Sequence, residues 1–134
     1  MVEAAPIHVV AGALFDAESR VLIAQRPAGK HMAGGWEFPG GKLEAGEPAR
    51  VGLGRELREE LGIEVLQAEP LVAYVHAYTD RRVLLDLWLV TAFRGEPQPL
   101  DAAALRWVEL PALEVAGLLE ADRPMIAALR AARG

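Results

Sequence analysis

The segment Gly41–Ile63, with the sequence GKLEAGEPARVGLGRELREELGI, decides how the rest of the chain is interpreted. Pro48 suits the first turn of a helix, and Gly62 suits the left-handed position that follows a last turn. Between them, apolar residues recur at helical spacings and predict one packed stripe, made of Val51, Leu53, Leu57 and Leu61. The segment therefore predicts a turn followed by an amphipathic helix that starts near Pro48 and ends at Gly62.

The predicted helix carries Glu56, Glu59 and Glu60 at relative positions i, i+3 and i+4. Residues with this spacing lie on one side of a helix, so their carboxylates converge. Converging carboxylates repel one another unless a cation lies between them, and hard oxygen ligands favour magnesium or manganese. The alternative is an acidic helix face that is simply solvated, as most charge runs are.

The whole segment also fits the longer pattern G-x5-E-x7-REU-x-EE-x-G-U, in which U is aliphatic. Every fixed position of this pattern is filled: Gly41, Glu47, Arg55, Glu56, Leu57, Glu59, Glu60, Gly62 and Ile63. The pattern is the Nudix box, and it is far more specific than a short glycine motif. The chain therefore resembles the Nudix hydrolases, and this resemblance favours a metal site over a solvated helix face.

Length and composition indicate a single globular domain over residues 1–134. Hydrophobic residues make up 52% and charged residues 25% of the sequence, and no apolar run approaches membrane-spanning length. Cysteine is absent, which excludes disulfides, thiolate zinc sites and cysteine nucleophiles. The N-terminus lacks the charged and apolar regions of an export signal, so we expect a cytoplasmic protein without a membrane partner.

The net charge is −5, and the sequence contains no basic block. This argues against a polymeric nucleic acid as partner, because phosphate backbones need clustered Lys and Arg. A small anionic ligand is compatible with the charge where a metal screens the acidic site. We therefore expect a small-molecule partner and a monomeric protein.

Short apolar runs rich in β-branched residues predict strands on both sides of the helix. They are Ile7–Phe15, Val21–Gln25, Glu64–Leu66, Leu71–Tyr78, Val83–Phe93 and Leu105–Glu109. The first two predict a hairpin-like opening, and the fourth either continues the third or forms the next strand. A turn or short helix is predicted at Pro111–Leu119, and a last helix from Arg123–Pro124 to Ala132. Strands that enclose one early and one late helix predict an α/β layered fold.

Outside the box, the chain resembles the MutT type of Nudix protein over nearly its whole length. The resemblance is carried by Gln25–Arg26, His31–Ala33, Trp36–Lys42, Tyr78–Asp80, Leu87–Val90, Trp107 and Ala121–Pro124. It implies an α/β/α sandwich around a mixed β-sheet. It also implies hydrolysis of a nucleoside triphosphate, above all 8-oxo-dGTP, to the monophosphate and pyrophosphate, which clears damaged precursors from the nucleotide pool.

The same resemblance assigns metal ligands. Glu56, Glu59 and Glu60, together with the backbone carbonyl of Gly40, are expected to hold Mg²⁺, for which Mn²⁺ is a substitute. Asp101 is either a further metal ligand or a solvated loop acid. The carboxylate that deprotonates the attacking water varies within the family, and Glu56 is the residue we expect to act as the base.

Arg55 is expected to form a salt bridge with Glu47 and so to aim the helix at the turn before it. A surface ion pair contributes little to stability, but one that positions metal ligands matters more for the rate. We therefore include Arg55 and Glu47 among the residues that are expected to support catalysis. Gly52 and Gly54, inside the helix, are each expected to lower its stability by up to about 1 kcal/mol.

The resemblance assigns substrate contacts to Arg26, His31, Phe38, Tyr78 and Asp80. Arg26 is expected to reach the nucleotide, with a solvated loop arginine as the alternative, and His31 is expected at the substrate's edge. Phe38 and Tyr78 are expected beside the base, where stacking suits aromatic rings, with ordinary core packing as the alternative. The tryptophans are predicted to lie in the core: Trp36, Trp88 and Trp107.

Asp122 departs from the MutT pattern, in which asparagine occupies this position. An ionised aspartate only accepts hydrogen bonds, so it suits the N1–H and amine of guanine but not guanine O6 or cytosine N3 unless it is protonated. Nudix enzymes with aspartate here include broader ones that accept pyrimidine triphosphates such as CTP. Another role, compatible with the first, is to cap the last helix.

These observations leave three hypotheses of function. The first is a magnesium-dependent pyrophosphohydrolase for 8-oxo-dGTP. The second is a related pyrophosphohydrolase with a pyrimidine or broad (d)NTP preference. The third is a Nudix-fold binding module without catalysis, which a degenerate box would favour and the complete box argues against.

Overall fold

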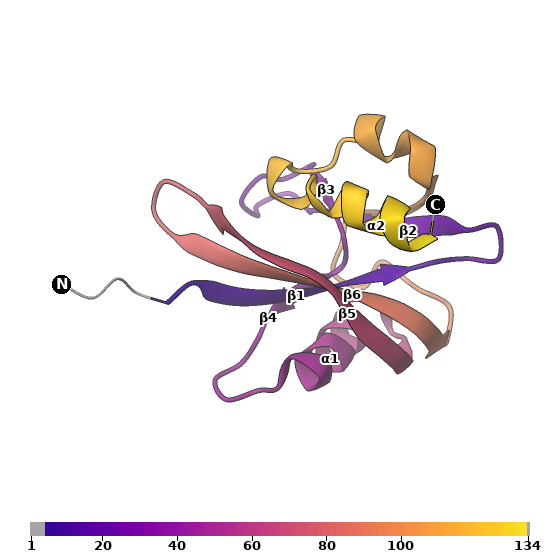
Figure 1. The fold of residues 1–134 in the computed structure, drawn as a ribbon, viewed down its shortest axis with the longest axis horizontal. Coiled ribbons are helices and arrows are strands. Elements are labelled where there is room, and N and C mark those ends of the chain that lie inside the picture. Colours follow the sequence, from indigo (N-terminus) through magenta and orange to yellow (C-terminus); the bar gives the residue numbers. More distant parts are fainter. Residues whose placement is uncertain (1–4, 134) are drawn as a thin grey trace.

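The computed structural model describes residues 5–133 and divides the strands between two sheets (Figure 1). The strands are β1 (Ile7–Leu14), β2 (Arg20–Gln25), β3 (Trp36–Glu37), β4 (Gly40–Lys42), β5 (Glu64–Ala77), β6 (Arg82–Arg94) and β7 (Ala104–Glu109). The helices are α1 (Ala49–Leu61) and α2 (Met125–Arg133), and the 3-10 helices are η1 (Leu110–Val115) and η2 (Glu120–Asp122). The predicted strands and helices are thus all present, with small shifts at their ends.

β1 lies inside the four-stranded sheet, whose strand order is β4-β1-β6-β5. It pairs parallel with β6 and antiparallel with β4, so the sheet is mixed. β2 belongs instead to the three-stranded sheet, ordered β3-β2-β7. The predicted hairpin-like opening is therefore present only at its turn, where Phe15 and Val21 form an antiparallel bridge, and the two strands part from there into different sheets. Val10–Leu14 is buried throughout, as expected for a strand inside a sheet that is covered on both faces.

The helices α1 and α2 cover opposite faces of the four-stranded sheet (Figure 1). Consecutive residues of β6 point to opposite faces, as strand geometry requires. Val90 of β6 accordingly packs in the cluster of α1, whose members include Leu53, Leu57 and Leu61. Leu89 packs in the cluster of α2, whose members include Met125, Ile126 and Leu129. This arrangement confirms the expected α/β/α layering around a mixed sheet.

α1 begins at Ala49, so Pro48 precedes its first turn rather than lying within it. Gly62 ends the helix as predicted, with a φ of 71° and its N–H donated to the carbonyl of Arg58. Val51 is 57% exposed and does not belong to the buried stripe. It precedes Leu53 by two positions, which turns a helical side chain by about 200° and so to the opposite side.

β5 is one continuous strand, which joins the two separately predicted segments. Register shifts against β6 near Gln67 and Pro70 accommodate the proline, whose missing N–H is tolerated because β5 is an edge strand. The last helix begins at Met125, directly after Pro124. The tryptophans are half-buried and pack against the two core clusters rather than inside them: Trp36, Trp88 and Trp107.

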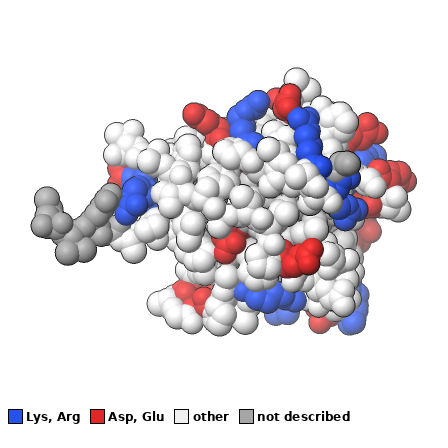
Figure 2. All heavy atoms as spheres, viewed as in Figure 1, with Lys and Arg blue, Asp and Glu red and all other residues white. Residues whose placement is uncertain are grey.

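Charged side chains of both signs are mixed on the face that Figure 2 shows. Among residues 5–133, no helix has the length and apolar character needed to cross a membrane. Figure 2 shows basic and acidic side chains interspersed around a largely uncharged centre of that face. Such a face lacks the continuous basic strip that a phosphate backbone requires.

Candidate active site

A cavity of about 380 Å³ lies where the two sheets, α1 and η2 come together. Its volume is in the range of small-molecule sites in proteins. The sequence-predicted residues that line it are Arg26, His31, Phe38, Gly40, Glu60, Tyr78, Asp101 and Asp122. The fold therefore brings together residues that are far apart in the sequence.

Glu60 occupies one end of this cavity. Its Oε2 accepts a hydrogen bond from the backbone N–H of Gly40 at 3.0 Å, which connects α1 to β4. The pKa of Glu60 is raised to about 8, chiefly by burial and also by the charges of Glu37, Asp101 and Glu56, against the lowering effect of the Gly40 bond. Burial also raises the pKa of Glu56. The predicted carboxylates interact in pairs, since the charge of Glu56 raises the pKa of Glu60 and the charge of Glu59 raises the pKa of Glu56.

Arg55 holds the acidic residues of the box with its whole guanidinium group. It pairs in a bidentate manner with Glu47, at 2.8 Å from Nε and 2.9 Å from Nη2. Its Nη1 donates to Glu56 at 2.9 Å and to Glu59 at 3.2 Å, and its Nη2 donates to the carbonyl of Lys42 at 3.1 Å. The hydrogen bonds from Arg55 lower the pKa of Glu47 to about 2. The predicted Arg55–Glu47 contact is present, and it extends to two metal-ligand candidates.

Gly41 is a glycine because Glu56 lies against its backbone. A Cβ at this position would lie 2.2 Å from Oε2 of Glu56, well inside van der Waals contact. Gly41 and Glu56, which are both fixed positions of the box, therefore pack directly against each other. Any larger residue would push Glu56 away from the turn that ends in β4.

The donor set at this end of the cavity fits a hard divalent cation. Glu56 and Glu60 supply carboxylate oxygens in a half-buried place where mutual repulsion needs a counter-charge. Within residues 5–133, no three acidic or histidine side chains already stand in a closed metal-binding geometry. Arg55 accounts for this, because it draws Glu56 and Glu59 toward its own guanidinium.

Asp122 occupies the other end of the cavity and is only 6% exposed. Its Oδ2 accepts a hydrogen bond from the backbone N–H of Phe38 at 2.9 Å. Burial raises the pKa of Asp122 to about 7; the Phe38 bond and the charge of Arg26 act in the opposite direction, and the charge of Glu37 adds to the rise. The carboxylate is thus bonded to the segment after β3 rather than to the first turn of α2, contrary to the expected helix cap.

Arg26 and Glu37 form an ion pair between the two ends of the cavity. Nη2 of Arg26 lies 2.9 Å from Oε1 of Glu37, and Nη1 donates to the carbonyl of His31 at 2.8 Å. Glu37 is close enough to affect the pKa of both Glu60 and Asp122. Sequence reasoning missed Glu37, although it lies inside the Trp36–Lys42 segment that carries the family resemblance.

The mouth of the cavity is formed by two loops that meet at Tyr78. The guanidinium of Arg81 lies 4.7 Å from the centre of the Tyr78 ring, and Arg81 also contacts Nδ1 of His31 at 3.4 Å. Asp80 is exposed, pairs with Arg81 at 3.2 Å and does not belong to the cavity lining. Phe38 lines the cavity but is 3% exposed and belongs to the core cluster.

Basic side chains that the sequence did not single out also line the cavity: Lys30, Lys42 and Arg81. They come from separate loops and strands, so no run of basic residues marks them in the sequence. Together with Arg26 they place four basic side chains in the lining of an otherwise acidic protein, beside the acidic residues Glu37, Glu60, Asp101 and Asp122. These basic side chains suit an anionic ligand.

Comparison with known proteins agrees with the fold and the site. Residues 10–128 match the family described as NUDIX domain, and the chain belongs to the Nudix family. It is a Nudix hydrolase similar to the MutT type: 45% of 96 aligned residues are identical to the 8-oxo-dGTP diphosphatase of Proteus vulgaris, covering 72% of this chain and 86% of that one.

A second relative and a solved structure cover more of the chain. The CTP pyrophosphohydrolase of Escherichia coli K12 is 42% identical over 130 residues, which cover 95% of this chain and 96% of that protein. The structure of MutT from Aliivibrio salmonicida and Vibrio cholerae aligns with a TM-score of 0.81 at 35% identity, covering 96% of this chain and 99% of that one. The expected Nudix fold is therefore confirmed.

Proposed function

We propose that the protein is a magnesium-dependent nucleoside triphosphate pyrophosphohydrolase of MutT type whose substrate is an oxidised purine nucleotide, 8-oxo-dGTP. Water attacks either the α or the β phosphorus. The bond between that phosphorus and the oxygen that bridges the two phosphates breaks. The products are the nucleoside monophosphate, pyrophosphate and a proton. Removal of the oxidised nucleotide would protect DNA from its incorporation.

One observation carries this proposal: a single cavity is lined both by Glu60 with Asp101 and by the buried Asp122. The carboxylates of Glu60 and Asp101 suit a triphosphate with its metal, and Asp122 suits the polar edge of a base. The basic residues of the lining, among them Lys30 and Lys42, suit the charge of the phosphates. A nucleotide is the small molecule that combines these three features.

The residues at the phosphate end divide the chemical work. Glu56, Glu59 and Glu60, with the carbonyl of Gly40 and with Asp101 as a further ligand, are proposed to hold Mg²⁺, which neutralises developing negative charge on the phosphates. Glu56 is proposed to accept the proton of the attacking water. Arg55 and Glu47 fix the direction of the glutamates, because the bidentate pair restricts both side chains.

We assign base contact to Asp122, with Arg26, His31, Phe38 and Tyr78 of the cavity lining as the other proposed substrate contacts, whereas Asp80 lies outside that lining. An oxidised guanine presents a donor at N7 beside the acceptor O6. A protonated carboxyl group matches that pair, because it donates through its hydroxyl and accepts through its carbonyl oxygen. A pKa of about 7 makes the protonated form of Asp122 available near neutral pH.

A second candidate function is pyrophosphohydrolysis of CTP or of a broad set of (d)NTPs. The same protonated Asp122 can donate to cytosine N3 and accept from the cytosine amine. The similarity to a CTP pyrophosphohydrolase over almost the whole chain favours this candidate. If cytosine binds in this way, the ratio of kcat/KM for CTP to that for dGTP will fall as the pH rises through about 7.

The decisive experiment measures kcat/KM with magnesium for 8-oxo-dGTP, dGTP, CTP and 5-hydroxy-dCTP, with pyrophosphate as the detected product. A lead of 8-oxo-dGTP over dGTP by orders of magnitude supports the first proposal, and a leading pyrimidine moves the substrate to the second. Glu56→Gln is the blank. Equal activity in that variant would refute the assignment of the metal and base residues.

The cellular setting is proposed on the same basis. We propose a monomeric protein that acts as a single domain over residues 1–134 in the cytoplasm, with a small nucleotide rather than a polymer as its partner. Mn²⁺ is expected to replace Mg²⁺, since both are hard cations that bind carboxylate and phosphate oxygens. Removal of divalent ions with a chelator should abolish turnover, and either ion should restore it.

A further inference from the structure

The segment that carries Asp122 is short, and both core packing and hydrogen bonds hold it in place. η2 spans only Glu120–Asp122, and Ala121 packs in the core cluster of α2. The N–H of Leu119 donates to the carbonyl of Trp36 at 2.8 Å, and the N–H of Phe38 donates to Asp122 at 2.9 Å. Both bonds lead to β3 and the residue just after it, and therefore to the three-stranded sheet.

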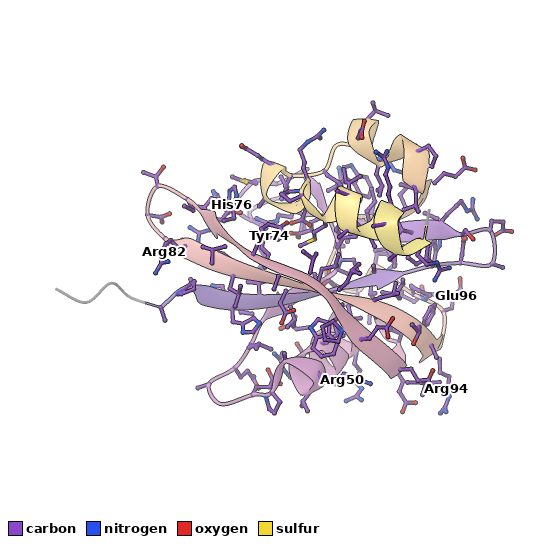
Figure 3. All side chains as sticks on the ribbon, viewed as in Figure 1. Arg50, Tyr74, His76, Arg82, Arg94 and Glu96 are labelled. Atoms are coloured by element: carbon purple, nitrogen blue, oxygen red, sulfur yellow. The ribbon has the colours of Figure 1, made fainter. Side chains whose placement is uncertain are left out.

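Tyr74 supplies a hydrogen bond from the other sheet. Its hydroxyl donates to the carbonyl of Ala121, the residue directly before Asp122, at 2.6 Å. Figure 3 shows Tyr74 and His76 on the half of β5 that leads to the β5–β6 turn. Burial, and then the charge of Asp122, raise the pKa of Tyr74, so its hydroxyl stays protonated and remains a donor.

The register of β5 connects this bond to the floor of the cavity. Tyr74 is paired across the sheet with Leu85 of β6, and Leu85 lines the cavity. The Tyr74 hydroxyl therefore connects β5, the neighbour of the cavity-lining strand β6, to the backbone that carries Asp122. With the bonds to Trp36 and Phe38, it fixes η2 from both sheets at once.

We infer that Tyr74 is a positioning residue for base selection, which holds Asp122 at the distance from the cavity floor that base discrimination requires. The inference rests on the proposed function, in which Asp122 contacts the base. Hydrogen-bond discrimination between bases needs donor–acceptor distances of about 2.7 to 3.2 Å, so a small displacement of η2 weakens it. Glu56, Glu59 and Glu60 of α1 make no hydrogen bond to Tyr74, whose hydroxyl is bonded to Ala121.

The test is Tyr74→Phe, which removes the hydroxyl and keeps the ring. Selectivity is measured as the ratio of kcat/KM between the best and the poorest of 8-oxo-dGTP, dGTP, CTP and 5-hydroxy-dCTP. Loss of one hydrogen bond should lower this ratio by about threefold to tenfold, through KM of the best substrate with little change in kcat. Val21→Ala, at the end of β2 away from the cavity and fully buried, is the control that lowers stability without changing selectivity.

A double variant separates positioning from a general effect. If Tyr74 acts through Asp122, Tyr74→Phe will not lower the selectivity of Asp122→Ala any further. The inference is overturned if Tyr74→Phe keeps the wild-type ratio, or if it lowers the ratio equally in both backgrounds. If Asp122→Ala itself keeps the wild-type ratio while Glu56→Gln is inactive, hydrolysis stands, but base contact by Asp122 and the inference fall together.

Discussion

Replacement of Asp122 by asparagine is expected to stabilise the protein at pH 8 far more than at pH 4.5. Asparagine has nearly the shape of aspartate, and its Oδ1 can accept the hydrogen bond that Phe38 donates to Asp122. It cannot ionise. The substitution therefore removes the cost of a buried negative charge at high pH, while at low pH the native aspartate is already protonated and carries no such cost.

The pKa of Asp122 fixes the size and sign of this effect. Its pKa is about 7 in the folded protein against an ordinary value of 3.8. Between these values the folded state holds a proton that the unfolded state has lost, so rising pH lowers the stability of the wild type until about pH 7. The stability difference between Asp122→Asn and wild type should therefore grow by about 3 kcal/mol from pH 4.5 to 8.

The assay is urea unfolding of both proteins at several pH values, followed by circular dichroism in the presence of a chelator. All other titrating groups are shared, so subtracting one curve from the other isolates position 122. A difference that does not change with pH would refute the buried, protonated state of Asp122. A variant that becomes less stable at pH 8 would refute it as well.

Three further predictions concern α1. Glu60→Gln should lower kcat/KM at least about a hundredfold without loss of the folded circular dichroism spectrum, and near-wild-type activity would exclude it as a ligand. Arg55→Lys should lower kcat about tenfold to a hundredfold, because lysine cannot pair with Glu47 in a bidentate manner; an unchanged kcat in steady-state assays would contradict this. Gly54→Ala should raise stability in urea by about 0.5–1 kcal/mol. Gly52→Ala should lower it, because the new Cβ would lie 2.9 Å from a Glu47 oxygen that Arg55 holds in place; equal gains in both variants would refute this distinction.

Local signals are sufficient to predict α1 and its acidic side. The capping glycine Gly62, the proline before the first turn and the spacing of the glutamates each depend on residues within one or two turns. Val51 shows the limit of such reasoning. It is apolar and is therefore predicted to lie in the buried stripe of the helix, but its spacing from Leu53 turns its side chain toward solvent. Gly52 shows a second limit, since the close approach of Leu43 and Glu47, which favours a glycine there, leaves no signal in the helix itself.

Contacts between distant segments could not be predicted in the same way. The opening strands look like a hairpin because they are adjacent in sequence, but the partners of β1 are β4 and β6, from later in the chain. The bond between Phe38 and Asp122 spans 84 residues, and the bond between Tyr74 and Ala121 spans 47. No periodicity or turn signal encodes such pairs, so the base end of the site emerges only when the sheets are assembled.

The guanidinium of Arg55 also bears on the order in which the protein is assembled. It brings an internal cation to Glu47, Glu56 and Glu59, so the acidic helix carries its own neutralising partner as it docks. Small domains whose ligands converge without such a partner fold only when a metal arrives. Here the repulsion among Glu47, Glu56 and Glu59 is offset within the chain itself, by a side chain that is present from the start of folding.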